Sequence, residues 1–267
     1  MTEPGQPSQP TSSITHRTRR MAAVAALSCA LAAQAATPAP APAAPAAAPA
    51  TDPLVEKVVD AYGGRAALSK VVAVRQRGRL VAVAQGGKQG AIVRLFARPD
   101  SLRIDIAYPD GSGEIRVAHQ GRATRQGMDV AGTPPGTAMA LQAARIALPF
   151  WLAAEPGRAR HVGSVEREGV RYEGLAVDLP GGLELVAEVE PASGRIVRTV
   201  GLMEGPGGGR FEFTNAYSDF KKVDGVLFAM REQNFAGGRQ TGETALEQVE
   251  LLPSPPPGAF ALDSKRL

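Results

Sequence analysis

Histidine and cysteine, two residue types that often bind metals or take part in catalysis, are scarce in this chain. The 267 residues include three histidines and a single cysteine, Cys29. His119 and His161 lie far apart in the sequence and lack the short spacing typical of a metal-binding pair. The sequence therefore predicts no metal site and no bound cofactor.

One short motif has the spacing of a catalytic one. Ser218 and Lys221 match Ser-x-x-Lys, a spacing that brings the lysine beside the serine only on a helical turn. The surrounding pattern is typical of strands, so we interpret the match as chance. The chain also contains no Gly-x-Ser-x-Gly motif and no glycine-rich phosphate loop before a helix. We therefore expect no catalytic residues and a protein that is not an enzyme.

The N-terminal part has the composition of an export leader followed by a spacer. A basic cluster at 16–20 precedes an apolar run that is too short to span a bilayer and ends in Ala33-Gln34-Ala35. We predict a signal peptide at 1–35, cleaved after Ala35. Twin-arginine export and lipid anchoring through Cys29 stay open as alternatives. Residues 36–51 are nearly all Ala and Pro, which indicates an extended spacer outside the fold.

The net charge gives no indication of a nucleic-acid partner. The whole chain has a formal charge of +4, and the predicted leader accounts for +2 of it through three arginines and one glutamate. The remainder of about +2 is too small to indicate a surface that binds nucleic acid.

The predicted fold begins with two short helices. Asp52 can cap a helix that has Pro53 at its first position and an apolar stripe on one side, and Gly63-Gly64 should end it. A second helical piece is expected at 65–70. Both precede a change from a helical to an alternating pattern of hydrophobic residues.

The alternating pattern predicts a long antiparallel meander. A first hairpin is expected over residues 71–98, with its turn at Gln85-Gly86-Gly87. Further strands are expected at 102–108, 113–119, 122–127, 169–179, 183–190, 195–203, 209–218, 226–235 and 240–252. Ten or eleven strands are enough for a single sheet to curl.

One apolar segment interrupts the strands. Residues 137–152 are hydrophobic almost all round, with only Gln142 and Arg145 polar in the middle. We predict a helix that is covered on more than one side, placed against the concave face of the curled sheet.

Two strand pairs resemble those of a known family. The first has Phe96-Ala97-Arg98-Pro99 at the end of one strand, then Leu102-Arg103, with Pro109 closing the next strand. The second carries Tyr217-Ser218-Asp219-Phe220 and Val223-Asp224-Gly225-Val226. These motifs, and the order of the predicted elements, resemble the LolA-type periplasmic lipoprotein carriers over nearly all of residues 52–252. The resemblance implies a mainly β fold with α elements, an unclosed half-barrel whose concave face holds lipid chains under helices, with residues 253–267 as a Pro-rich tail.

The resemblance also implies site residues. In LolA-like carriers the arginine of the Arg-Pro turn is thought to hydrogen-bond the helical lid and keep the empty cavity shut, which assigns Arg98 as a lid latch. The implied cavity lining consists of hydrophobic residues from the two strands that flank the Arg-Pro turn and from the apolar helix: Leu95, Leu102, Ile104, Ile106, Met139, Leu141, Ile146, Leu148, Phe150 and Trp151. From the residues alone, an ordinary packed core explains the helical side chains equally well.

The function implied is that of a non-enzymatic periplasmic protein that binds lipid or lipoprotein. Its expected partners are acyl chains and lipoprotein-transfer proteins of the inner or outer membrane, and it is expected to act as a monomer. Two alternatives stay open: a periplasmic sensor or regulatory module that uses the same fold, and, less favoured, an envelope hydrolase.

Overall fold

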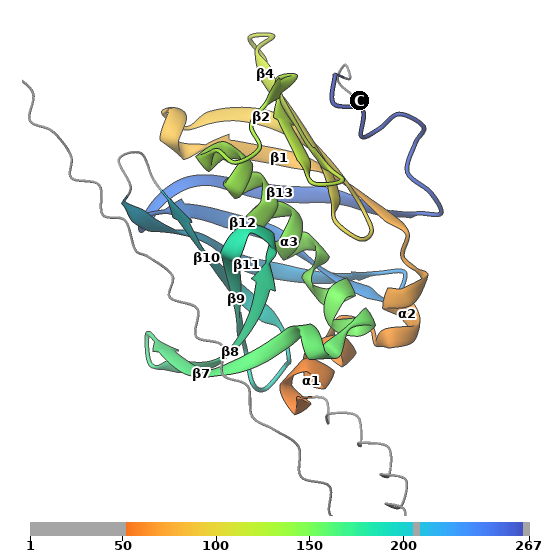
Figure 1. Cartoon of the computed structure of the whole chain (residues 1–267), viewed down its shortest axis with the longest axis vertical. Helices are drawn as coiled ribbons and strands as arrows, with labels where there is room; N and C mark the ends of the chain where they lie inside the picture. Colours follow the sequence, from red (N-terminus) through yellow and green to blue (C-terminus); the bar gives the residue numbers. More distant parts are fainter. Residues whose placement is uncertain (1–51, 205–208, 264–267) are drawn as a thin grey trace, which may run out of the picture. The chain divides into compact units, whose positions relative to one another are not determined.

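The computed structural model describes residues 52–204 and 209–263 (Figure 1). The predicted signal peptide at 1–35 and the spacer at 36–51 lie outside the described residues. The described chain is mainly β, with helices packed against one face of a single sheet.

Two blocks of antiparallel strands make up the sheet. The first block comprises β1 (Ala73–Ala82), β2 (Lys88–Ala97), β3 (Ser101–Ala107), β4 (Gly113–His119), β5 (Arg122–Arg125) and β6 (Met128–Asp129). The second comprises β7 (Ala159–Arg167), β8 (Val170–Leu179), β9 (Leu183–Val189), β10 (Ile196–Glu204), β11 (Arg210–Val223), β12 (Val226–Ala236) and β13 (Arg239–Leu252). Each block is a meander of neighbours in sequence.

The two blocks join where β1 pairs with β13, and the sheet order runs from β6 through β1 and β13 to β7. β6 and β7 are the two edges and do not pair, so the sheet is not closed into a barrel. At the central joint Gly78 lies beside a register shift, where a Cβ would come within 2.1 Å of the Ala245 carbonyl oxygen. Only a residue without a side chain allows this approach.

The described residues form 13 strands, more than the ten or eleven expected. β7 was missed because it is an edge strand whose residues are exposed or only partly buried on both faces, so its sequence shows no alternation. β6 has only two residues and leaves no pattern to detect. Three short 3₁₀ turns, Val83–Gln85, Pro156–Arg158 and Pro180–Gly182, connect neighbouring elements.

The two N-terminal helices are confirmed. α1 spans Pro53–Ala61, and the Asp52 side chain accepts a hydrogen bond from the Leu54 backbone N–H at 2.8 Å. α2 spans Arg65–Lys70. The sharp turn between them fits closely over the β11–β12 turn, since a Cβ on Gly63 would lie 2.4 Å from the Gly225 carbonyl oxygen.

The apolar helix is confirmed and is longer than expected. α3 spans Pro134–Ala154, because the Thr133 side chain caps it and the prolines of its first turn need no hydrogen-bond acceptor. By length and composition α3 would suffice to cross a membrane, but 61% of its most apolar stretch is buried inside the fold. It is therefore placed as a core helix.

α3 connects the two edges of the sheet, because it follows β6 and precedes β7. It contacts β2, β4 and β5 from one block and β9 and β10 from the other, and it runs across the face of the sheet in Figure 1. Its fit to β10 is close: a Cβ on Gly201 would lie 2.5 Å from the buried Leu141 side chain. The sheet thus has one face covered by α3.

The C-terminal segment packs on the opposite face of the sheet as far as residue 263. The fully buried Arg103 donates a hydrogen bond to the Ala259 carbonyl oxygen at 3.2 Å, and the Phe260 ring stacks on His119. The Thr124 hydroxyl donates to the Leu262 carbonyl oxygen at 3.1 Å. Residues 253–263, which we expected to form a tail beyond the domain, therefore contribute to the folded unit.

Candidate functional site

Two cavities flank α3. One lies between the first half of α3 and strands from β1 to β5 and β11 to β13 and has a volume of about 420 Å³; we call it the arginine cavity, for Arg94, Arg116, Arg125 and Arg145 in its wall. The other lies on the opposite side of α3, toward β4, β5 and the start of β9, and measures about 790 Å³. We call it the alanine cavity, for Ala118, Ala123, Ala140, Ala143 and Ala144. Pro134 lines both, so both cavities reach the first turn of α3.

A buried ion group lies behind the wall of the arginine cavity. In it Glu232 of β12, which lines a smaller neighbouring cavity, lies between Arg94 and Arg145, which line the arginine cavity. Arg94 of β2 forms two hydrogen bonds with the Glu232 carboxylate, at 2.7 and 2.8 Å, and the Arg145 guanidinium of α3 lies 3.4 Å from it. Arg94 is 3% exposed, Glu232 is 5% exposed and Arg145 is 7% exposed, so all three residues are buried. This inner group joins α3 to both blocks of the sheet.

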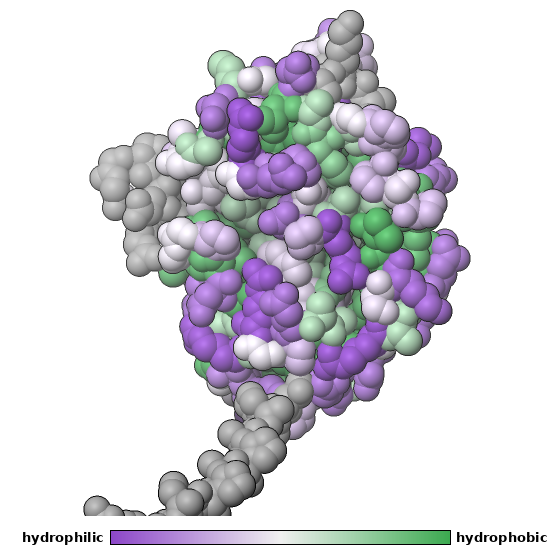
Figure 2. Space-filling view, turned by 45° about the vertical axis from the view of Figure 1, so that its right-hand side comes forward, coloured by the Kyte–Doolittle hydropathy of each residue, from purple (hydrophilic) through white to green (hydrophobic). Residues whose placement is uncertain are grey.

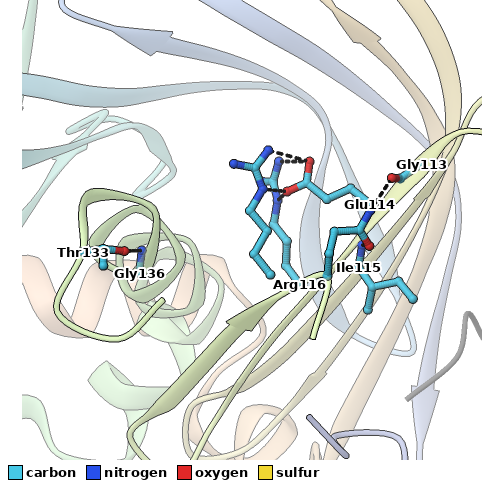
Figure 3. Close-up of polar contacts among 8 residues, drawn as sticks. Gly113, Glu114, Ile115, Arg116, Thr133 and Gly136 are labelled. Atoms are coloured by element: carbon cyan, nitrogen blue, oxygen red, sulfur yellow. Dashed lines mark hydrogen bonds and ion pairs between the residues drawn. The ribbon is translucent and has the colours of Figure 1, made fainter. Parts of the chain in front are cut away.

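A second ion group lies nearer the start of α3. Figure 3 shows Glu114 extending from β4 toward the same space as Arg116, with the first turn of α3, marked by Thr133 and Gly136, nearby. The Glu114 carboxylate accepts hydrogen bonds from Arg116 at 2.6 Å and from Arg125 at 2.5 Å. This outer group also consists of two guanidiniums on one carboxylate.

The electrostatics keep both carboxylates ionised. Burial by itself raises the pKa of Glu232, but the positive charges of Arg94 and Arg145 outweigh it and hold that pKa below its usual range. The same balance, with Arg116 and Arg125 as the cations, lowers the pKa of Glu114. Burial raises the pKa of the neighbouring Tyr217, whose hydroxyl lies 2.8 Å from Thr199 Oγ1, so the phenol stays neutral.

The alanine cavity has a different character. Small side chains of α3 and the first strand block form one wall, and Leu179, Leu183 and Leu202 of the second block form part of the other. Trp151, the single tryptophan of the chain, also lines it. Charged residues such as Arg122 and Arg158 also contribute. Small side chains leave the space empty, and the leucines make much of its surface apolar.

Comparison with known proteins bears on the fold. No protein-family model matches the chain, and no curated protein matches it in sequence. The structure of a LolA superfamily protein from Nitrosomonas europaea aligns with a TM-score of 0.50 at 11% sequence identity, covering 78% of this chain and 96% of that one. The fold is LolA-like. At 11% sequence identity the alignment shows a similar fold and gives no information on activity.

Two further solved structures align less closely. One is described as an outer membrane lipoprotein-sorting protein domain from Vibrio parahaemolyticus, with a TM-score of 0.44, 12% identity, and coverage of 79% of this chain and 100% of that one. The other is a DUF1329 family protein from Desulfovibrio piger, with a TM-score of 0.37, 10% identity, and coverage of 79% and 98%.

The expected lining residues of the LolA-like fold are divided among different places. Ile104, Ile106 and Met139 line the arginine cavity, and Trp151 lines the alanine cavity. Ile146 and Phe150 line a small cavity of about 70 Å³ between α3 and β11–β12. Leu102, Leu141 and Leu148 are buried in the hydrophobic core and line none of these cavities.

Leu95 lies on the opposite face of the sheet from α3. Its neighbour Phe96 stacks on Phe150 of α3 with ring centroids 5.6 Å apart, and successive residues of a strand point to opposite faces. Leu95 is also paired in register with Arg103, which the C-terminal segment covers. The expectation that Leu95 lines the cavity under α3 is corrected by this register.

Arg98 is bonded to α2 and not to the apolar helix. Its guanidinium donates to the carbonyl oxygens of Ser69 at 3.1 Å and Val71 at 3.4 Å, at the C-terminal end of α2. α2 is in turn held to the last turn of α3, where Arg65 donates to the Ala153 carbonyl oxygen at 2.5 Å. The sequence argument assigned Arg98 a bond to the apolar helix; the hydrogen bonds reach it only through α2.

A direct bond between the Arg-Pro turn and α3 comes from Trp151. Its indole Nε1–H donates to the Pro99 carbonyl oxygen at 2.9 Å, and the Arg158 guanidinium stacks over the ring at 4.0 Å. Sequence reasoning placed Trp151 only as a cavity wall. A tryptophan N–H usually finds an acceptor when buried, which is the signal that could have suggested this bond.

The inner and outer ion groups were also not predicted from the sequence. No sequence pattern indicated a role for Arg94, and Arg145 was named only as one of two polar interruptions of an apolar helix. An arginine within an otherwise apolar helix is itself a signal, because a buried cation requires a partner. What could not be read was that Glu232, far away in sequence, supplies that partner.

The described residues provide no assembled catalytic group. No cluster of three or more His, Cys, Asp or Glu side chains that could hold a metal occurs among them. Ser218 and Lys221 both lie on β11, where residues three apart point to opposite faces. Ser101 Oγ lies 2.8 Å from His119 Nδ1, but Ser101 is buried and His119 is stacked against Phe260.

Proposed function

We propose that this protein is exported to the periplasm and binds the acyl chain of a lipid or lipoprotein in the alanine cavity. The observation that carries the proposal is the position of α3, which bridges the two edges of an open LolA-like sheet and leaves a cavity of about 790 Å³ on one side. Cavities of this size are typical of small-molecule sites. The leader pattern at 1–35 supports the location.

The energetics of chain burial fit such a site without any catalytic group. Burying a methylene contributes about 0.8 kcal/mol, so a 16-carbon chain supplies roughly 12 kcal/mol before the costs of association. Those costs are at least about 4 kcal/mol, so no more than about 8 kcal/mol remains, which corresponds to micromolar affinity at best. A carrier that must release its cargo to a transfer protein at a membrane requires an affinity of that kind.

The distribution of hydrophobic residues on the surface supports a binding site for an apolar ligand inside the protein. Figure 2 shows a face on which hydrophilic side chains predominate and hydrophobic ones occur in small separate groups. Large hydrophobic residues that are exposed, such as Val72, Met128 and Val170, lie on separate elements. Scattered apolar residues of this kind do not form a docking patch.

The single tryptophan gives a direct test. Because Trp151 lines the alanine cavity, stearate brominated on its chain should quench the fluorescence of the exported protein saturably and at micromolar concentration. Free bromide is the control, because it measures how strongly a quencher that stays in the solvent reduces the fluorescence of Trp151. Failure of brominated stearate to quench more than free bromide does would contradict the proposal.

A matched pair of variants locates the site. Ala140 is an exposed residue of α3 that lines the alanine cavity, and Ala91 is an exposed residue of β2 that lines neither cavity. Ala140→Phe should fill part of the space and weaken binding of brominated stearate at least tenfold, whereas Ala91→Phe should not change it. Equal effects of the two substitutions would place the fatty acid elsewhere.

A further inference from the structure

The wall of the arginine cavity has an excess of positive charge. The inner group contains Arg94 and Arg145 on Glu232, and the outer group contains Arg116 and Arg125 on Glu114. Each group has two cations and one anion, which gives a net charge of +1 per group and +2 for both.

The other carboxylate in the wall reduces this excess. Glu243 lines the cavity and shares Arg231 with Asp219, at 3.0 and 3.1 Å, so this third group has one net negative charge. An excess of one positive charge therefore remains around a cavity that α3 covers.

The inner group has polar atoms that the fold leaves unused. The Nε atoms of Arg94 and Arg145 have no acceptor within the described part of the chain, and the side-chain oxygen of Gln142 has no donor there. All three residues line the arginine cavity and are at least nine-tenths buried. A buried guanidinium with a free N–H is a strong donor for an anionic oxygen.

Hydrophobic side chains form a large part of the remaining wall. Leu80, Ile92, Ile104, Ile106 and Met139 face the same space as the arginines. A free inorganic anion would leave these side chains without contact, and a neutral alkyl chain would leave the positive charge unmatched. A ligand that suits both parts has an anionic end and an apolar chain.

We propose that the arginine cavity binds the anionic head of a single-chain amphiphile, a carboxylate or a phosphate monoester, whose chain continues past Pro134 into the alanine cavity. This inference rests on the proposed function and names the class of lipid. It assigns the arginines of both groups to the head group and the alanine cavity to the chain.

Calorimetric titration of the exported protein with four compounds tests the head group. Dodecanoate and dodecyl phosphate should bind about ten- to a hundredfold more tightly than dodecanol, the range expected for hydrogen bonds to a charged group. Inorganic phosphate, which has no chain, should show no saturable binding.

Three arginine variants assign the effect to the cavity. Arg145→Gln should weaken dodecanoate binding about tenfold, and so should Arg125→Gln, at a residue that is partly exposed. Each substitution should therefore bring the affinity for dodecanoate closer to the affinity for dodecanol. Arg79→Gln is the control, because Arg79 is an exposed residue of β1 that pairs with Glu247 outside the cavity. It should leave the affinity for dodecanoate unchanged.

The outcomes separate the two proposals. Equal affinities for dodecanoate and dodecanol, or full dodecanoate affinity in both Arg125→Gln and Arg145→Gln, would overturn the head-group inference and leave acyl-chain binding intact. Saturable binding of inorganic phosphate as tight as that of dodecyl phosphate would also overturn it. Binding of none of the alkyl compounds would refute the proposed function as well.

Discussion

Glu232 is the residue on which the centre of the fold depends most. It neutralises one of two buried guanidiniums and connects β12 to β2 and, through Arg145, to α3. A buried ion pair adds little stability compared with a well-packed apolar pair, but removing one partner leaves an uncompensated charge. Glu232 is therefore expected to be far less replaceable than the leucines around it.

Glu232→Gln should lower the free energy of unfolding at pH 7 by about 3–5 kcal/mol, because Arg94 and Arg145 then share no counter-charge. The pKa of Glu232 is lowered in the folded state, so its contribution is complete above the unfolded pKa of about 4.3 and is lost as the pH falls through the folded pKa. Wild type should thus lose stability in acid, and the variant should lose less. Urea unfolding from pH 7 down to pH 3 measures both.

The control for this prediction is Glu247→Gln, which removes a carboxylate that is half exposed and paired with Arg79. It should change the unfolding free energy by less than about 1 kcal/mol. A similar small effect for Glu232→Gln would mean that the inner group is hydrated and not buried in the working protein.

At the scale of elements, the corner formed by α2, the end of α3 and the Arg-Pro turn controls how firmly the helices are held. Arg98 bonds α2, Arg65 bonds α2 to α3, and Trp151 bonds α3 to the carbonyl oxygen of Pro99. These contacts lie beside the alanine cavity, since Trp151 lines it. If an acyl chain enters as proposed, it would have to loosen these contacts.

Arg98→Leu should therefore favour the loaded protein. Its hydrogen bonds to Ser69 and Val71 stabilise only the closed arrangement, so their loss should tighten binding of brominated stearate about tenfold. Hydrogen exchange should become faster in α2. Fluorescence titration and exchange mass spectrometry measure the two effects.

The buried Arg103 is unsuitable as a control on this hairpin, because it forms an ion pair with Asp105 beneath the C-terminal segment. Arg79→Leu, on the exposed side of β1, serves instead. Unchanged affinity in Arg98→Leu would reduce Arg98 to a residue that stabilises α2. Weaker binding would show that it holds the ligand.

The sequence predicted elements better than it predicted the site. The start of α1 at Asp52 follows from local capping and most strands follow from alternation, so both were predicted. The start of α3 was expected at residue 137, and its cap at Thr133 was missed. β7 lacks alternation because both of its faces are mostly open to solvent. The partners of Arg94, Arg98 and Arg145 are set by which strands meet across the sheet, and no local pattern contains that information.

At the scale of the whole described unit, the two faces of the sheet are covered differently. One face carries α3 and both cavities, and the other is covered over β3–β5 by residues 253–263. Arg103, Thr124 and His119 each contact this segment from a different strand. The segment therefore acts as a clamp on the first strand block, away from the site proposed for the lipid.

Removal of residues 256–267 should lower stability without removing binding. One hydrogen bond from a charged group contributes about 1.5–3 kcal/mol, and the partial burial of Ala259 and Phe260 adds to it, so the unfolding free energy should fall by about 2–4 kcal/mol. Phe260→Ala should give a smaller loss in the same direction. Urea unfolding followed by circular dichroism measures both.

The affinity of the truncated protein for brominated stearate should stay within about twofold of wild type, because the cavities lie on the other face of the sheet. At a ligand concentration a hundred times the dissociation constant, binding should restore about 2.7 kcal/mol of stability, which approaches the loss caused by truncation. A large loss of affinity at temperatures where the truncated protein is still folded would show that the clamp shapes the cavity through the sheet. The two faces would then be coupled, and the curvature that the C-terminal segment imposes on β3–β5 would be part of the binding site.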